Sequence, residues 1–215
     1  NQRESISTDL NVVGEAPPKI PPAFRDSTYV FLANTHPAVQ YAFAEQLQSP
    51  RLVVCDTMDL WINDFRDDLV RTLSAVHGVV LNDGEARLLT QRSDLIDAGR
   101  RVLEYGPQFV VVKKGEHGAM LVTPDDVVVL PAYPTTQVED PTGAGDSFAG
   151  GMMAHLASID RTDPAALKSA LAWGTCVASI AIEAFSLDGL RRADRAAVAS
   201  RVERFRAMLT FAPAE

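Results

Sequence analysis

Residues 78–85 read Gly78-Val79-Val80-Leu81-Asn82-Asp83-Gly84-Glu85, a short apolar run that is followed at once by polar residues. The apolar part predicts a buried strand, and a helix is predicted to follow from Glu85. The same alternation recurs on both sides, with further strands predicted near residues 28–32, 51–55 and 108–113. Short strands that alternate with helices predict an α/β fold, with a mostly parallel sheet flanked by helices.

Helices are predicted between these strands and over most of the C-terminal third. They cover Pro37–Gln48, with Pro in the first turn, Trp61–Val76, with one apolar face, and Asp94–Tyr105. Two further strands, 119–122 and 127–130, flank a turn and predict an antiparallel hairpin at one side of the sheet. Three later apolar faces are predicted from Phe148, Met152 and Leu156; from Leu167, Leu171, Gly174, Ala178 and Phe185; and from Val198, Val202, Phe205 and Leu209.

The first 25 residues differ in character from the rest of the chain. Leu10 and Val12 alternate with polar neighbours, which predicts a short strand. The prolines at positions 17, 18, 21 and 22 then favour an extended connector. We therefore divide the chain into an N-terminal segment, residues 1–25, and a globular part, residues 26–215.

The bulk composition limits the classes of partner. The 215 residues include 20 Lys and Arg against 28 Asp and Glu, a net charge of −8. A nucleic-acid partner usually requires a basic face, so we expect none. No apolar stretch approaches the roughly 20 residues that span a bilayer, so we expect no membrane partner. Cys55 and Cys176 lie in apolar runs without metal-ligand spacing, which favours reduced thiols in a cytoplasmic protein.

The run most suited to chemistry is residues 138–148, which read VEDPTGAGDSF just before a predicted helix. A helix start has unpaired backbone N–H groups and favours negative charge. Gly143, Ala144 and Gly145 would let a phosphate approach those amides closely. Asp146 would then lie where a carboxylate can take the proton of an attacking hydroxyl. The same residues also fit a plain glycine turn followed by an acid that favours a helix N-terminus.

This stretch resembles the C-terminal signature of the ribokinase-like, or PfkB, carbohydrate kinases, Asp-Thr-Thr-Gly-Ala-Gly-Asp-Ser/Thr-Phe. The one departure is Pro141 in place of the first Thr. The resemblance implies that Asp146 is the catalytic base and that Gly143, Ala144 and Gly145 form the anion hole. Asp140 and Thr142 resemble positions that help to bind a monovalent cation in some members. Pro141 has no N–H to donate, which changes the surroundings of that cation.

Asn82 and Glu85 match the Asn-x-x-Glu motif of the family, which holds the magnesium and phosphate water network. The residues alone fit two readings equally well, since Asn with Glu three positions later is also a helix capping box. A largely hydrated, oxygen-preferring cation suits the first reading.

Lys113 and Gly115 resemble the family segment in which a strand ends near the nucleotide, often as Thr-x-Gly. Lys113 occupies the Thr position, as a cation near the phosphates or as part of a solvated strand end. The expected nucleotide contacts are Lys113, Gly115, Thr142, Gly143 and Gly145. Asp56 ends a strand at the edge where ligands of parallel sheets bind. It could touch substrate, but the better reading is that it caps the next segment.

The resemblance covers nearly the whole chain, but we find neither the first strands of the family's sheet nor most of its β lid. Residues 1–20 resemble the tail of that lid. We expect an ATP- and Mg²⁺-dependent kinase, with a monovalent cation as a further candidate, that phosphorylates a hydroxyl of a sugar or sugar-like molecule. Two alternatives stay open: a nucleoside acceptor, and a nucleotide-binding remnant without catalysis. A homodimer is a candidate assembly.

Overall fold

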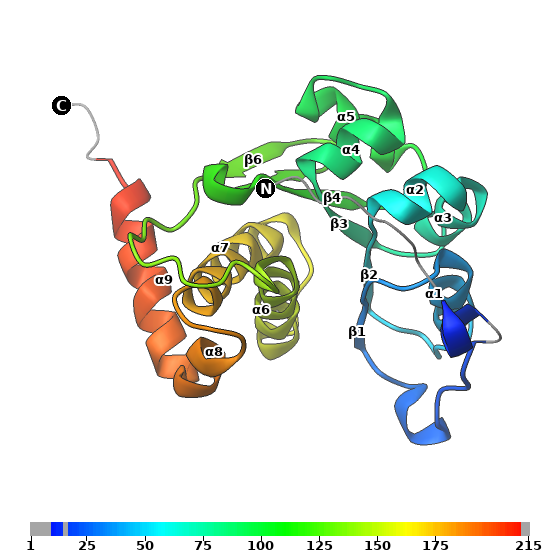
Figure 1. Ribbon diagram of the computed structural model, residues 1–215, viewed down its shortest axis with the longest axis horizontal. Coiled ribbons are helices and arrows are strands. Elements are labelled where there is room, and N and C mark those ends of the chain that lie inside the picture. The colour runs from blue at the N-terminus through cyan, green and yellow to red at the C-terminus, as the bar shows by residue number, and fades with distance from the viewer. Residues whose placement is uncertain (1–9, 15–16, 212–215) are drawn as a thin grey trace.

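The computed structural model describes residues 10–14 and 17–211. Its centre is one six-stranded sheet in the order β1-β2-β3-β4-β5-β6 (Figure 1). Strands β1 to β4 are parallel, and β4, β5 and β6 pair antiparallel, which confirms the predicted sheet and hairpin. The strands are β1 Tyr29–Leu32, β2 Leu52–Asp56, β3 Gly78–Asn82, β4 Phe109–Lys113, β5 Ala119–Val122 and β6 Val127–Leu130.

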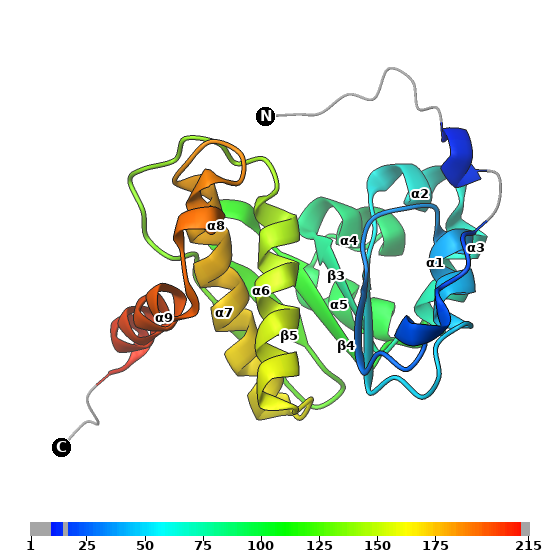
Figure 2. The same ribbon diagram turned by 90° about the horizontal axis from the view of Figure 1, so that it is seen from below.

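Helices cover both faces of the sheet (Figures 1 and 2). One group is α1 Pro37–Ala44, α2 Asp59–Asp64, α3 Arg66–Leu73, α4 Asp83–Thr90 and α5 Leu95–Leu103. The group on the opposite face is α6 Ala144–Ile159, α7 Pro164–Ile182, α8 Asp188–Arg192 and α9 Arg195–Leu209. Both faces are therefore buried, which explains why the central strands are apolar throughout.

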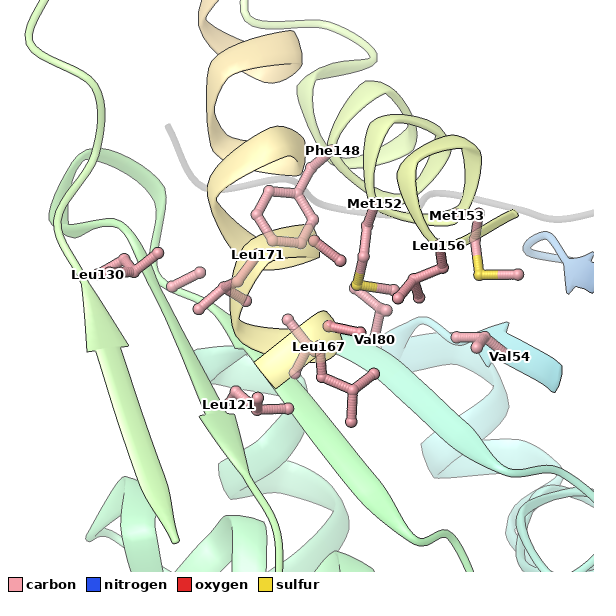
Figure 3. Close-up of a cluster of buried hydrophobic side chains, with 14 of the residues drawn as sticks. Val54, Val80, Leu121, Leu130, Phe148, Met152, Met153, Leu156, Leu167 and Leu171 are labelled. Carbon is pink, nitrogen blue, oxygen red and sulfur yellow. The ribbon is translucent and has the colours of Figure 1, made fainter. Parts of the chain in front are cut away.

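Side chains alternate between two hydrophobic cores along each central strand, as the pleat requires. Val53 and Val79 pack with the helices of the first group, whereas Val54 and Val80 pack under α6 and α7. Figure 3 shows the second core, which includes Leu121, Leu130, Phe148, Met152, Met153, Leu156, Leu167 and Leu171.

Three sequence expectations are wrong. Residues 11–14 form a 3-10 turn, so the strand predicted around Leu10 and Val12 is absent there; residues 1–9 lie outside the described part. The helix predicted from Trp61 to Val76 is two helices, α2 and α3, which meet at Phe65 with φ −134° and ψ 39°. Phe185 lies beyond the end of α7 at Ile182 and is 66% exposed, so it does not belong to the apolar face of that helix.

Helix α7 has the length and hydropathy of a membrane span, although the sequence predicted no stretch near that length. More than half of the tested window is buried inside the protein. Its side chains Leu167, Ala170 and Leu171 belong to the core beneath the sheet. The apolar character of α7 is thus that of a core helix with neighbours on several sides.

Candidate active site

The glycine-rich run forms the turn into α6. Gly143 is the N-cap residue and has φ 75°, a left-handed conformation that glycine adopts without strain. The turn is closed by hydrogen bonds from Ala144 N to Pro141 O, at 3.2 Å, and from Ser147 N to Gly143 O, at 2.8 Å. A side chain added at Gly143 would meet nothing within 4 Å, so the approach to this helix start is open. Asp146 lies in the first turn and is exposed.

Strand register brings the other predicted residues to one edge of the sheet. Asn82 pairs with Lys113 across β3 and β4, and both are the last residues of their strands. Asp56 is the last residue of the neighbouring strand β2. Because these strands are parallel, the three residues end on the same side.

Lys113 connects this edge with the start of α6. Its Nζ lies 3.0 Å, and its Cε 3.9 Å, from the place that a Cβ on Gly145 would occupy. The ammonium group therefore rests against the glycine run, and any side chain at position 145 would displace it. The structure thus brings Lys113 and the run 143–146 together, while the role of each residue stays a prediction.

Asn82 and Glu85 form a complete capping box at the start of α4. Asn82 Oδ1 accepts from Glu85 N at 2.8 Å, and Glu85 Oε2 accepts from Asn82 N at 2.7 Å. Burial raises the pKa of Glu85, while the Asn82 N–H and Lys113 act in the opposite direction. The motif therefore does form a capping box. The second carboxylate oxygen of Glu85 makes no hydrogen bond among the described residues.

Asp140 holds two loops together. Its Oδ1 accepts from Thr142 N at 3.0 Å, and its Oδ2 accepts from Ser186 N at 3.3 Å. These bonds hold the pKa of Asp140 below its usual value, with the Thr142 N–H as the main cause. The backbone N–H groups of Glu139 and Asp140 both donate to Ile182 O, so the run before α6 is fixed to the end of α7.

Gly115 begins a 3-10 turn after β4 with φ 56°, and a side chain there would meet nothing within 4 Å. The turn itself requires the positive φ, and the space beside it is open. The nucleotide contact of Gly115 stays a prediction.

The preferred reading of Asp56, as a cap of the next segment, was wrong, and the other reading, a substrate contact, stays a prediction. Met58 precedes α2, and no side chain caps that helix, so Asp56 does not serve as its cap. Asp56 is instead buried at the sheet edge, and its Oδ1 makes no hydrogen bond within the described residues. Burial raises the pKa of Asp56 to about 7, partly offset by Lys113 and assisted by Asp146 and Glu85. The sequence feature that could have indicated a buried acid is its place at the end of an otherwise apolar strand.

The mostly parallel sheet and the glycine-rich helix start at its carboxyl edge define a protein of the ribokinase-like α/β class. The model of the pfkB family carbohydrate kinases matches residues 37–189, which is more than half of the chain. The chain therefore belongs to the pfkB family of carbohydrate kinases. This membership supports phosphotransferase as the class of enzyme.

Relatives within the family differ in their acceptors. A cytidine kinase of Thermococcus kodakarensis is 33% identical over 147 residues, covering 66% of this chain and 51% of the relative. A fructokinase of Vibrio cholerae, solved with fructose, ADP and calcium, superposes with a TM-score of 0.70 at 19% identity, over 84% of this chain and 62% of the other. Aminoimidazole riboside kinase of Salmonella enterica, solved with its riboside and an ATP analogue, superposes with a TM-score of 0.65 at 19% identity. That superposition covers 87% of this chain and 65% of the kinase. The chain thus spans about half to two thirds of these proteins.

Proposed function

We propose that the protein transfers the γ-phosphate of ATP to a hydroxyl group of a sugar or sugar-like small molecule. The observation that carries the proposal is the Lys113 ammonium, which lies against Gly145 at the start of α6. A cation and a helix N-terminus at one point make a site that favours phosphate. Family membership supports the reaction class.

Asp146 is proposed as the general base. It is exposed in the first turn of α6, so an acceptor hydroxyl can reach it. The amides of Gly143, Ala144 and Gly145 would stabilise the charge that develops on the transferred phosphoryl group. Thr142, Lys113 and Gly115 are proposed as further nucleotide contacts around the same opening.

Asn82 and Glu85 fit a hydrated magnesium ion better than a closed metal cage. Among the described residues, no group of three acidic, His or Cys side chains could hold a metal. Mg²⁺ commonly keeps several waters and takes one or two carboxylates together with phosphate oxygens. Glu85 would provide one carboxylate, and the nucleotide would provide the phosphate oxygens. When bound, the ion would neutralise charge on the phosphates. Asp140 is proposed for a monovalent cation, although both its oxygens already accept backbone N–H groups.

A nucleoside is the second candidate acceptor, favoured by the similarity to the cytidine kinase. The third reading is nucleotide binding without catalysis. We further propose that the protein is cytoplasmic and has no nucleic-acid or membrane partners. We also propose that it forms a homodimer, which light scattering would test.

The decisive experiment measures ADP release from ATP and Mg²⁺ by the full gene product with a panel of sugars and nucleosides. We expect turnover with members of one class only, and acceptor-dependent release that is about 10²- to 10⁴-fold slower in the Asp146→Asn variant. Turnover with sugars alone supports the main proposal, and turnover with nucleosides alone supports the alternative. Calorimetric binding of ATP without turnover on any acceptor would sink both kinase readings and support the third.

A further inference from the structure

An open hollow of about 430 Å³ lies between α7, α8 and α9. These helices stand at the end of the molecule opposite α1 (Figure 1). Ile180 contributes apolar surface to the lining, and Arg192, Arg201 and Arg204 contribute three guanidinium groups. Pockets for small molecules have roughly 300–1,000 Å³ and combine apolar surface with a few polar groups. None of the residues proposed for phosphoryl transfer lines this hollow, so it is a separate feature of the described chain.

Arg201 forms one wall of the hollow and is held in place. Its Nη1 donates to Glu183 Oε1 at 2.9 Å, and its Nη2 donates to Glu183 Oε2 at 2.8 Å. The guanidinium also lies over the ring of Tyr133, 4.9 Å from the centroid. A two-bond contact with a carboxylate fixes the orientation of a guanidinium as well as its position. Because Glu183 balances its charge, Arg201 shapes the hollow but does not make it positive.

Arg192 and Arg204 have no such acidic partner. Neither forms an ion pair within 4.0 Å among the described residues. Arg192 Nε donates to Asp188 O at 3.0 Å, which holds the side chain along α8 and leaves its Nη groups for another acceptor. A guanidinium presents its donors as a planar fork that matches phosphate and carboxylate. Two such groups at one hollow therefore favour an anion there.

The acidic side chains nearest in the sequence do not neutralise this charge. Asp194 caps α9, and Glu203 pairs with Arg206 at 3.6 Å. Asp188 begins α8 and, like the other two acids, does not line the hollow. Residues 188–206 contain six Arg against three acids, although the whole chain has a net charge of −8. The positive charge is thus concentrated around the hollow.

Helix electrostatics accounts for only part of this pattern. Basic side chains are favourable near the C-terminal end of a helix, which explains Arg191 and Arg192 in the last turn of α8. It does not explain Arg204, which comes before the last turn of α9 and lines the same hollow as Arg192. A ligand that needs both guanidinium groups explains the two together.

We propose that the hollow between α7, α8 and α9 binds a small phosphorylated molecule, with Arg192 and Arg204 as its phosphate contacts. A phosphate monoester carries close to two negative charges at neutral pH, which matches two guanidinium groups without acidic partners. Ile180, Ala193 and Ala197 offer apolar surface to the organic part of the ligand. The proposal is independent of the proposed phosphoryl transfer.

Calorimetry of the full gene product with phenyl phosphate tests the proposal, with inorganic phosphate and phenol as partial ligands. We expect phenyl phosphate to bind more tightly than either partial ligand. Arg192→Gln and Arg204→Gln should each weaken its binding by about tenfold, because each removes a charge-assisted hydrogen bond. Arg206→Gln removes the same charge from α9 outside the hollow, and Lys113→Met removes the cation of the candidate active site. Both should bind phenyl phosphate as the wild type does.

Equal weakening in Arg206→Gln would indicate a diffuse effect of charge, and weakening in Lys113→Met alone would indicate binding at the candidate active site. Either result would overturn the proposal, as would a wild type that does not bind phenyl phosphate. Inorganic phosphate that binds as tightly as phenyl phosphate would overturn the assignment of an organic ligand. Arg204 makes no hydrogen bond or ion pair within the described chain, so Arg204→Gln is expected to keep the fold, which a melting curve checks. A second readout is the NMR signal of Arg204 Nε–H, which should shift as phenyl phosphate is added, and an unshifted signal would contradict the contact.

Discussion

At the scale of single residues, the sharpest prediction concerns Asp146. The change Asp146→Asn keeps the size of the side chain but removes its ability to accept a proton, so we expect phosphoryl transfer to fall about 10²- to 10⁴-fold. ADP binding should stay close to normal, because backbone amides and Lys113 would hold the phosphates. Steady-state kinetics and calorimetry are the paired measurements, with a melting curve to confirm folding. Normal turnover would remove Asp146 from the mechanism.

Asp56 predicts a dependence of stability on pH. Its pKa in the folded protein is raised from 3.8 to about 7, mainly by burial. The folded state thus binds more protons than the unfolded state between these pH values. The contribution of Asp56 to the free energy of unfolding is therefore fully present below pH 4 and is lost as pH rises through 7. We expect Asp56→Asn to remove this loss, which makes the variant more stable than the wild type at pH 8. Thermal melts at pH 5 and pH 8 check this, with Asp64→Asn as the exposed control.

An equal pH response in wild type and Asp56→Asn would show that Asp56 keeps an ordinary pKa. The expected gain in stability at pH 8 would separate Asp56 from a residue that serves only the fold. A residue that served only the fold would lose stability on replacement.

At the scale of elements, the start of α4 combines a capping box with a proposed magnesium motif. The change Asn82→Ala should lower the free energy of unfolding by about 1 kcal/mol, because the cap to Glu85 N is lost. If the motif also serves magnesium, Asn82→Ala and Glu85→Ala should reduce activity in a way that higher magnesium concentrations partly restore. Kinetics over a magnesium series and urea melts separate the effects. Lower stability with an unchanged dependence on magnesium would show that the motif serves only as a capping box.

The elements that sequence predicts well are those whose signal is local. The strands of the sheet are apolar runs bounded by turns, and all six lie within two residues of their predicted bounds. The division at Phe65 could not be predicted in this way, because it interrupts a continuous apolar face. There Phe65 packs against His36 and Trp61, with ring centroids 4.4 and 5.6 Å away, and such contacts depend on the folded protein. Tertiary packing has overridden the local pattern.

The candidate site shows the same limit. The glycine run, Asn82, Glu85 and Lys113 were identified from short motifs, since their residue types and spacing are local. Asp56 was misread because its meaning comes from neighbours 29 or more positions away, Glu85, Lys113 and Asp146. Only the strand register and the fold bring these charges together, and a single sequence does not contain that information in any local pattern.

At the scale of the whole molecule, α6 joins the site to the core. Its first turn carries the glycine run, and its remaining turns pack against α7 beneath the sheet (Figure 3). Two glycines allow the close approach of these helices. A Cβ on Gly174 would lie 2.7 Å from Phe148 O, and one on Gly151 would lie 2.8 Å from Val177 Cβ. The position of the active-site turn therefore depends on how closely α6 and α7 pack.

The pair Gly174→Ala and Gly150→Ala tests this dependence, because both add one methyl group to a helix. At Gly174 the methyl group collides with backbone, which cannot move aside as a flexible side chain can, so we expect a loss of about 1–3 kcal/mol. At the exposed Gly150 it meets nothing within 4 Å, and the higher helix propensity of Ala should add about 0.5–1 kcal/mol. Urea unfolding measures both, and ADP calorimetry should show weaker binding in Gly174→Ala alone, since a displaced α6 shifts residues 143–146. Equal stability changes would show that the helices separate without cost and that the site is independent of their packing.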